Sequence, residues 1–339
     1  MKSNSSVFLS LLESYLYNYL PISKGLTEST IITYKSVFRL FLEYLYTKHK
    51  ISPTNITFEA LNVDVLSGFL DWIEQERGCS VSTRNHRLSV LVSFSEYACN
   101  RNFEAAVIFG QNLSKIPRKK GCNKKRSIFT RQEVQILLSL PNTNNSIGIR
   151  DRTLLSFMYA SGVRAQEVCD MTVGDIRFEN TNATVSILGK GRKIRMISIP
   201  EKASKILRKY IEYRHISTKY DRHVFSSQTH EKMTVSCVEE IFAKYITLAR
   251  INHPDLFRED SYPPHSMRHT TATHMLESGV PLIVVKNFLG HKSLQTTQIY
   301  AEISMDTVNK QLLEWNSKWF VKDMRETQDV QSDIPSFLK

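Results

Sequence analysis

A single segment of alternating hydrophobic residues interrupts a chain whose apolar pattern is otherwise helical. The segment reads ATVSIL, then GKGR, then KIRMISIP, over residues 183–200. The alternation is typical of two strands, and the glycines on either side of Lys190 are typical of a hairpin tip. Before residue 115 no such alternation occurs. The sequence therefore predicts a mainly α-helical protein with a small antiparallel β-sheet, in the α+β class.

The N-terminal region carries three predicted helices, over residues 26–49, about 58 to 77 and about 82 to 101. Apolar residues recur in each at steps of three and four residues. The first turns of the third helix carry Arg84, Asn85 and Arg87, whose guanidinium and amide groups can donate hydrogen bonds to a DNA backbone. Polar residues also collect at helix starts as caps, so this segment alone leaves both roles open.

The positive charge of the chain is concentrated in twelve residues. The chain has 45 basic and 33 acidic residues, a net charge of +12. Residues 1–114 hold 10 of each, whereas the segment KIPRKKGCNKKR, residues 115–126, holds seven basic residues and no acidic one. The seven are Lys115, Arg118, Lys119, Lys120, Lys124, Lys125 and Arg126. Such a segment is expected to lie on phosphates, and the alternative is a flexible linker kept soluble by its charge.

Length and composition favour two folded domains. At 339 residues, with 41% hydrophobic residues, the chain can bury two ordinary cores. We expect a helical domain over residues 1–114, a basic linker over 115–126, a second domain over 127–320 and a polar tail over 321–339. No apolar run approaches the ~20 residues of a membrane span, and the five cysteines form no CxxC pair. These features predict a cytoplasmic protein without a membrane partner.

The second domain begins with a capping box, from Thr130 to Glu133. A strongly apolar helix, RTLLSFMYA, follows and stops at Ser161-Gly162, and a short helix then carries Arg164 in its first turn. After the hairpin, further helices are predicted over residues 201–215 and 234–250.

Proline and glycine divide the stretch from residue 263 to 300 into three short helices. The first follows two prolines and ends at Gly279, the second runs from Pro281 to Gly290, and Ser293 is the predicted N-cap of the third. His265, Arg268 and His269 gather in the first turn of the first helix, where free N–H groups favour an anion. His291 lies just past the second helix, and Tyr300 lies on the third.

These residue types suit attack on a phosphodiester. A phenol has a pKa near 10, so only about one part in 10³ is ionised at neutral pH, and a tyrosine nucleophile needs a base or a cationic field. Two guanidiniums can hold the non-bridging oxygens of a phosphate in fixed geometry. A lysine on a hairpin tip can bring the proton that the departing oxygen requires.

Four segments in this order resemble the motif boxes of a known family. The runs ASGVRAQEV, LGKGRKIRMISIP, PHSMRHTTATHML and FLGHKSLQTTQIY are similar to those of the tyrosine recombinases, the phage integrase family, in its simple two-domain type. The resemblance extends over residues 127–315, and the nine-residue step from His291 to Tyr300 fits it. Met267 is a small departure, since the family often has leucine there. The N-terminal region looks like the core-type DNA-binding domain of that family, with weaker motifs.

The resemblance implies a clamp around duplex DNA and cleavage through a 3′-phosphotyrosyl intermediate. It also implies strand exchange in a homotetramer, or in a tetramer shared with a related recombinase, and a tail over residues 321–339 that docks on the neighbouring subunit. Because the bond energy stays in the phosphotyrosine, neither ATP nor a metal is required. A cytoplasmic protein of this kind would be associated with the nucleoid.

The resemblance also assigns a role to each matching residue. It implies that Arg164 and Arg268 bind the scissile phosphate, that Lys190 is the general acid, and that His265 handles the tyrosine proton. His291 would donate to a phosphate oxygen, and Tyr300 would be the nucleophile. Glu167 is expected to orient the active-site arginine or its neighbours, with a surface helix pair as the alternative. His269 is expected to support the site.

Several other functions fit parts of this pattern. His265 and His269 could be zinc ligands of a metal-dependent phosphohydrolase, but HSMRH lacks the glutamate of the metalloprotease motif. A type IB topoisomerase would use the same nucleophile, and a non-catalytic DNA-binding regulator would not need all six residues. We interpret the chain as the integrase or transposase of a mobile element, and a chromosome-dimer-resolving recombinase is the alternative role.

Overall fold

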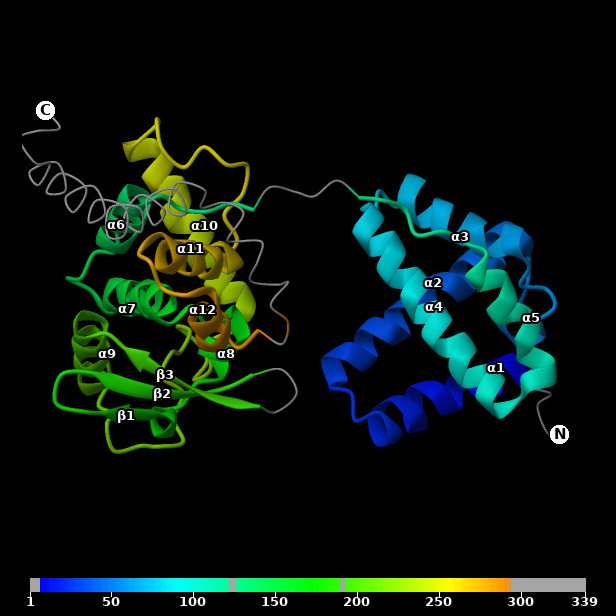
Figure 1. The fold of residues 1–339 in the computed structure, drawn as a ribbon, viewed down its shortest axis with the longest axis horizontal. Coiled ribbons are helices and arrows are strands. Elements are labelled where there is room, and N and C mark those ends of the chain that lie inside the picture. The colour runs from blue at the N-terminus through cyan, green and yellow to red at the C-terminus, as the bar shows by residue number, and fades with distance from the viewer. Residues whose placement is uncertain (1–6, 122–125, 190–192, 292, 294–339) are drawn as a thin grey trace, which may run out of the picture. The chain divides into compact units, whose positions relative to one another are not determined.

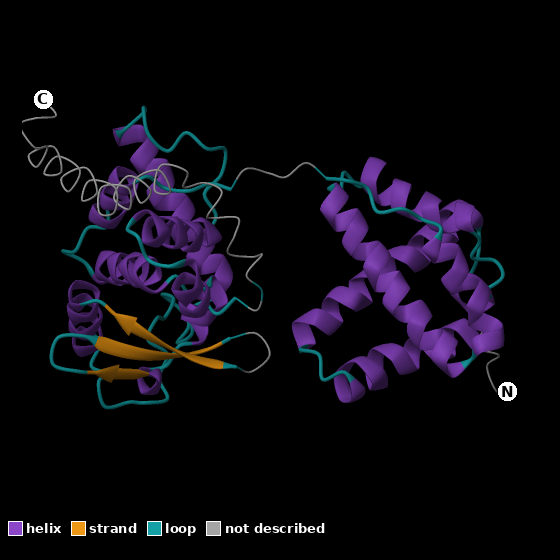
Figure 2. Ribbon diagram, in the orientation of Figure 1, coloured by secondary structure: helices purple, strands orange, loops and turns teal. Residues whose placement is uncertain are grey.

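The computed structural model describes residues 7–121, 126–189, 193–291 and 293, and the chain falls into two compact units (Figure 1). The first unit is Met1–Lys124, and the second is Lys125–Lys339. Helices dominate both, and strands occur only in the second among these residues (Figure 2). The predicted α+β class is therefore confirmed. No helix in the described ranges is long and apolar enough to cross a membrane.

The first unit is a bundle of helices. They are α1 (Val7–Ser14), the π-helix η1 (Tyr15–Ser23), α2 (Glu28–His49), the short η2 (Pro53–Asn55), α3 (Val63–Gln75), α4 (Val81–Arg101) and α5 (Phe103–Ser114). The sequence did not predict α1, η1 or α5. Helix α3 begins later than predicted because Asn62 caps it, accepting a hydrogen bond from the backbone of Val65 at 2.9 Å. Phe58 is buried in the turn before that cap.

Aromatic side chains from four segments fill the core of this unit. Phe8 of α1 meets Phe58 and Phe94 edge to face, with ring centroids 5.3 and 5.4 Å apart. Phe109 of α5 packs against the same cluster, 6.4 Å from Phe8. Edge-to-face pairs of this kind are favourable beyond the burial of their area, so α1 and α5 are fixed to α4 through one shared core.

Residues 115–121 pack along α4, although we predicted them as part of a linker. Ile116 is buried, and Arg84 donates to the carbonyl oxygen of Pro117 at 3.0 Å. The amide of Asn85 donates to the carbonyl oxygen of Lys119 at 2.8 Å and accepts from its N–H at 3.2 Å. The Lys119 ammonium is 2.7 Å from Glu74. The first part of the basic segment is therefore held on the first unit by side chains of α3 and α4.

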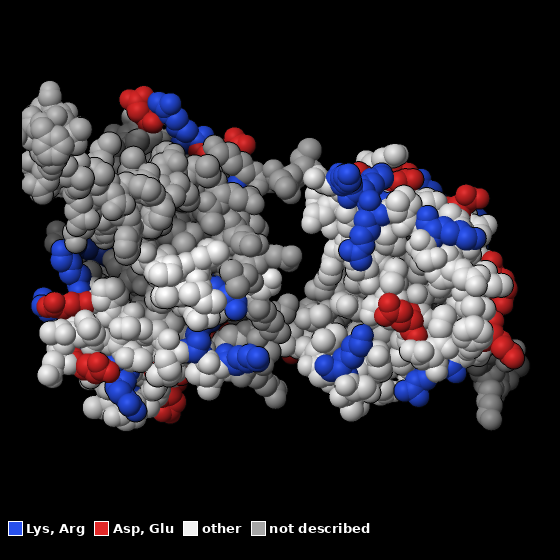
Figure 3. Space-filling view, viewed as in Figure 1, with Lys and Arg blue, Asp and Glu red and all other residues white. Residues whose placement is uncertain are grey.

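The prediction that Arg84 contacts DNA is corrected by this packing. Only 3% of Arg84 is exposed, and its guanidinium bonds to Pro117 and Asn85 inside the unit. Arg87 is half-buried and donates to the sulfur of Cys79 at 3.2 Å. On the face of the first unit in Figure 3, basic and acidic side chains are interspersed, in line with the 10 residues of each sign in residues 1–114.

The second unit has a three-stranded antiparallel sheet in the order β1-β2-β3 and helices packed against it (Figure 1). Its elements are α6 (Arg131–Ser139), α7 (Ser146–Ser161), α8 (Ala165–Asp170), η3 (Val173–Asp175), β1 (Ile176–Phe178), β2 (Ala183–Leu188), β3 (Ile194–Ile199), α9 (Glu201–Tyr213), α10 (Val235–Asn252), α11 (Pro264–Glu277) and α12 (Leu282–Leu289). The hairpin β2–β3 was predicted, whereas β1 was not. In the structure Val185 of β2 lies opposite Ile197 of β3.

Helix α7 is the central element of this unit. It contacts α6, α9, α11 and β3, and its apolar residues are buried on several sides, Leu154, Leu155, Phe157 and Met158 among them. A helix that is apolar all round belongs in a core, as the run RTLLSFMYA indicated. The predicted capping box of α6 is present, and Glu133 also accepts from the backbone of Phe257 at 2.5 Å. Helix α7 thus leads from the core of this unit to Gly162 and Arg164, which follow it in the chain.

Replacing Arg84 by methionine is expected to destabilise the protein without acting on DNA contacts directly. Loss of hydrogen bonds from a buried guanidinium should lower the free energy of unfolding by about 1.5–3 kcal/mol. Arg39→Met, at an exposed position of α2, is the control and should stay within about 0.5 kcal/mol of the unchanged protein. Chemical denaturation measures both. Unchanged stability with weaker DNA binding would contradict the packing role.

Candidate active site

The C-terminal end of α7 delivers Arg164 to the start of α8. Gly162 takes a left-handed conformation with φ +58°, and a Cβ there would stand 2.7 Å from Leu289. The chain then extends, and Arg164 is the N-cap of α8, one position before the first turn in which we predicted it. Glu167 accepts from the Arg164 backbone at 2.9 Å and from its guanidinium at 2.8 Å. Glu167 therefore contacts Arg164, a predicted active-site residue, and its predicted role in orienting that arginine stays a prediction.

Arg195 of β3 completes this cluster, and the sequence analysis missed it. Its two terminal nitrogens donate to the two carboxylate oxygens of Glu167 at 2.9 and 2.7 Å. Burial acts to raise the pKa of Glu167, but the hydrogen bonds from Arg195 and the Arg164 backbone, with both arginine charges, lower it to about 2. Glu167 is thus a carboxylate at neutral pH, held between two guanidiniums.

A signal for Arg195 was present in the strand pattern. In the strand KIRMISIP, Ile194, Met196, Ile197 and Ile199 alternate only imperfectly with polar residues, and the structure leaves Ile194 68% and Met196 60% exposed. Arg195 instead shares the inward face with Ile197 and Ile199. A charged residue in register with a buried face requires a partner, and Glu167 is that partner.

Arg268 is fixed by the ends of two helices. It lies on α11, is 1% exposed, and donates to the carbonyl oxygens of Gly162 and Leu289 at 2.6 Å each. These carbonyls stand at the C-terminal ends of α7 and α12, where helix dipoles favour a positive charge. The second helix end is itself shaped by a glycine, since Gly290 has φ +69°.

Three histidines lie around the arginines. The rings of His265 and His269 on α11 are edge to face, with centroids 4.6 Å apart. Partial burial, followed by the charges of Arg268 and Arg164, lowers the pKa of His265. Part of the residue still faces solvent. Burial and then His265 lower the pKa of His269 to about 3.

His291 completes the described part of the site. The chain leaves α12 through Gly290, and the backbone N–H of His291 donates to the carbonyl of Lys286 at 3.0 Å. Burial and the charges of Arg268, Arg164, His265 and Arg195 lower the pKa of His291 to about 4. The structure therefore brings five predicted residues together with Glu167, namely Arg164, His265, Arg268, His269 and His291. Each of the three histidines is neutral at pH 7.

Lys190 and Tyr300 lie outside the described residues, as do Lys124, Lys125 and the predicted tail. Their roles remain predictions. The hairpin stem is described up to Gly189, whose N–H donates to the carbonyl oxygen of Lys193 at 2.8 Å. Met267, the small departure in the motif, is fully buried in the core. Lys115 and Lys120 are exposed, and Arg118 donates to Ser89 at 3.1 Å.

Arg126, at the end of the basic segment, lies on the second unit. It is partly buried, and its charge contributes to lowering the pKa of both His265 and His269. Among the described residues, no group of three or more His, Cys, Asp or Glu side chains is placed to hold a metal ion.

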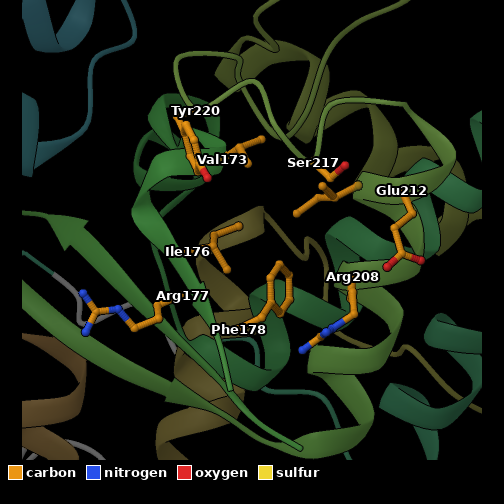
Figure 4. Close-up of a pocket in the computed structure, with 9 residues that line it drawn as sticks. Val173, Ile176, Arg177, Phe178, Arg208, Glu212, Ser217 and Tyr220 are labelled. Atoms are coloured by element: carbon orange, nitrogen blue, oxygen red, sulfur yellow. The ribbon is translucent and has the colours of Figure 1, made fainter. Parts of the chain in front are cut away.

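A separate cavity lies on the sheet side of the second unit. It has a volume of about 390 Å³ and lies between β1 and α9, with the guanidinium of Arg208 4.6 Å over the ring of Phe178 (Figure 4). Tyr220 and Ser217 come from the loop after α9. None of the residues assigned above to the active site lines it.

Sequence comparisons identify relatives along most of the chain. Residues 127–307 match the phage integrase family, and residues 12–102 match the N-terminal SAM-like domain of phage integrases. The putative integrase/recombinase y4rC of Sinorhizobium fredii is 30% identical, with 87% of each chain covered. Tyrosine recombinase XerD of Haemophilus influenzae is 27% identical, covering 89% of this chain and 96% of XerD.

Solved structures share the fold. The XerH site-specific recombinase bound to a palindromic difH substrate has a TM-score of 0.66 at 24% identity, covering 86% of this chain and 80% of that one. The Tn1549 transposon integrase in complex with a circular intermediate DNA has a TM-score of 0.67 at 16% identity, covering 88% and 98%. The fold and the order of the motifs are those of a tyrosine recombinase. The chain belongs to the phage integrase family.

The depressed histidine pKa values predict a loss of stability in acid. A histidine whose pKa is about 4 in the folded protein binds fewer protons than in the unfolded chain, where its pKa is about 6.5. Stability should therefore fall as pH drops from about 6.5 towards 4. Thermal unfolding measured against pH should show this slope, and His291→Gln should reduce it. His253→Gln, at an exposed position after α10, is the control. A slope that His291→Gln leaves unchanged would contradict a neutral His291.

Proposed function

We propose that this tyrosine recombinase cleaves and rejoins duplex DNA at specific sites through a 3′-phosphotyrosyl intermediate on Tyr300. The observation that carries the proposal is the convergence of Arg164, Arg268, His265 and His291 at the ends of α7, α11 and α12. The motif order and the nine-residue step from His291 to Tyr300 support the choice of nucleophile.

The two arginines suit the binding of a scissile phosphate. That phosphate carries one negative charge and gains another in the transition state, so cations fixed beforehand stabilise the transition state more than the ground state. Arg268 is held by two carbonyl oxygens, and Arg164 is held by Glu167. Neither guanidinium must be ordered by the substrate. The site therefore provides preorganised positive charge around the place of the phosphate.

The proton transfers follow from the protonation states. The phenol oxygen of Tyr300 attacks phosphorus, its proton passes to neutral His265, and the bond from phosphorus to the 5′ oxygen breaks. Lys190 gives its proton to that 5′ oxygen. His291, also neutral, donates an N–H to a non-bridging oxygen. Rejoining reverses these steps with a 5′ hydroxyl from another strand, and because one ester replaces another, no ATP is consumed.

The partners of this chain follow from the same chemistry. The proposed substrate is double-stranded DNA carrying a recombination site, and the solved XerH and Tn1549 integrase chains are themselves described with DNA. Lys115, Arg118, Lys120, Lys124, Lys125 and Arg126 are proposed backbone contacts. Lys119 contributes less because Glu74 already neutralises it. Asn85 and Arg87 remain proposed contacts beside α4.

We propose assembly into a homotetramer on DNA, with residues 321–339 docking on a neighbouring subunit. An assembly of this size suits an exchange in which two duplexes are each cut and rejoined. For the biological role, we propose the integrase of a mobile element acting at the nucleoid. The resolution of chromosome dimers is the second candidate, since XerD and XerC are among the relatives.

Tyr300→Phe should bind DNA normally yet form no covalent adduct, because the ring is kept and the attacking oxygen is lost. The unchanged protein is first denatured in SDS, and the DNA that stays covalently attached to it is sequenced. A duplex of that sequence then serves as the substrate. Gel mobility of that duplex with each protein, in SDS, is the measurement. An adduct formed by the variant and mapped to another tyrosine would refute the assignment.

Lys190→Ala should lose about 10²–10⁴ in cleavage rate, which is the usual contribution of one general acid. A substrate with sulfur in place of the bridging 5′ oxygen has a thiol leaving group of pKa near 8.5, which departs without a proton. The sulfur substrate should therefore restore cleavage by Lys190→Ala but not by Arg268→Ala, whose defect is in holding charge. Single-turnover rates on both substrates provide the measurement. Equal rescue of both variants, or of neither, would exclude Lys190 as the acid.

A further inference from the structure

Arg195 lies between the elements that carry the active-site residues. It comes from β3, opposite Ile187, and its side chain reaches Glu167 on α8. The contact has two parallel N–H···O bonds, at 2.9 and 2.7 Å, and only 13% of the Arg195 side chain is exposed. A two-point pair of planar groups fixes orientation as well as distance. Arg195 therefore sets the rotation of the Glu167 carboxylate.

Glu167 transmits this restraint to Arg164. Its oxygen Oε1 accepts from Arg195 and from the guanidinium of Arg164, and Oε2 accepts from Arg195 and from the Arg164 backbone. Arg164 is a long side chain with 36% of its surface exposed, so packing alone does not restrain it. The carboxylate thus determines where the Arg164 guanidinium points.

The alkyl stem of Arg195 contacts the turn before His291. A Cβ on Gly290 would stand 2.8 Å from Cδ of Arg195, so the stem and the glycine are in close contact. Gly189, the last described residue before the hairpin tip, lies beside the same guanidinium, with its would-be Cβ 3.3 Å from Nη1. One side chain therefore contacts residues adjoining His291 and Lys190, and the carboxylate that holds Arg164.

We infer that Arg195 is a positioning residue of the recombination reaction, which orients Arg164 through Glu167 and supports the turn that carries His291. The inference rests on the proposed roles of Arg164 and His291. Arg195 itself is not proposed to bind phosphate, because both of its terminal nitrogens face the Glu167 carboxylate. It acts on the reaction through its neighbours.

The test compares Arg195→Met, Arg195→Lys and a matched control in the full-length protein. Methionine keeps an apolar stem, and lysine keeps the charge but not the two-point pair. Arg177→Met, at an exposed position of β1 in the same sheet, is the control. Single-turnover cleavage of the recovered duplex should fall about 10²-fold for Arg195→Met, the usual cost of a misplacement of about 1 Å. Arg195→Lys should recover only part of the rate, and the control should match the unchanged protein.

A double variant separates positioning from general destabilisation. In an Arg164→Ala background the arginine that Arg195 orients is absent, so adding Arg195→Met should cost less than the same change costs alone. Binding of the uncleaved duplex should be about the same with and without Arg195 because the pair faces inward. The inference would be overturned if the loss of cleavage rate in the double variant equalled the product of the two single losses. A loss of binding as large as the loss of rate would also overturn it. If Arg195→Met does not fold, Arg195→Lys replaces it in the double variant with the same expected outcome.

A measurement without DNA tests the contact itself. In the unchanged protein Glu167 has a pKa of about 2, below that of an unfolded glutamate, so its contribution to stability is present above about pH 4.5 and is lost as pH falls towards 2. Without Arg195, only the backbone hydrogen bond and the charge of Arg164 oppose the effect of burial, so the pKa of Glu167 rises and this contribution becomes smaller. The difference in unfolding temperature between the two proteins should therefore shrink as pH falls from 5 to 3. A difference in unfolding temperature that stays constant from pH 5 to 3, as expected for Arg177→Met, would contradict the contact between Arg195 and Glu167. If the unchanged protein cleaves no DNA, the proposed function fails together with this role, whereas the contact is still measured.

Discussion

The ion pair of Glu167 with two arginines is the interaction on which the described site depends. Arg164, Arg195 and Arg268 gather near three histidines, and like charges at short range raise the free energy of a folded chain. Glu167 offsets part of that repulsion and stays ionised because hydrogen bonds from Arg195 and Arg164 outweigh its burial. Replacing it with a neutral residue would leave buried positive charge without compensation, which is more costly than removing the whole cluster.

The third arginine is compensated in a different way. Arg268 is almost fully buried, and its guanidinium donates hydrogen bonds to main-chain carbonyl oxygens at the ends of α7 and α12. These carbonyls are available because each helix ends in a glycine with a left-handed backbone, Gly162 and Gly290. A side chain at either glycine would meet Leu289 or Arg195 within 3 Å. The same turns that deliver Arg164 and His291 to the site therefore also hold Arg268.

The sequence was informative wherever a local rule determined the structure. The hairpin alternation, the capping box at Thr130 and the breakers around α11 and α12 each specify an element by themselves, and the structure contains all of them. The misses depended on tertiary contacts. Helices α1 and α5 are stabilised through a shared aromatic core, and Arg84 is buried because residues 115–121 fold back onto α4. Arg195 was missed because its partner is 28 residues away on another element, a pairing that spacing does not reveal.

The neutral histidines link substrate binding to proton affinity. In the free protein burial and nearby positive charge keep His265, His269 and His291 unprotonated, so His265 can accept the proton of the nucleophile in the proposed mechanism. A phosphate bound between Arg164 and Arg268, as proposed, would bring negative charge close to the same rings and raise their pKa values. The base is therefore weakest when the site is empty and gains proton affinity as the phosphate enters and acquires charge. In the proposed mechanism, activation of the tyrosine is therefore coupled to the arrival of DNA.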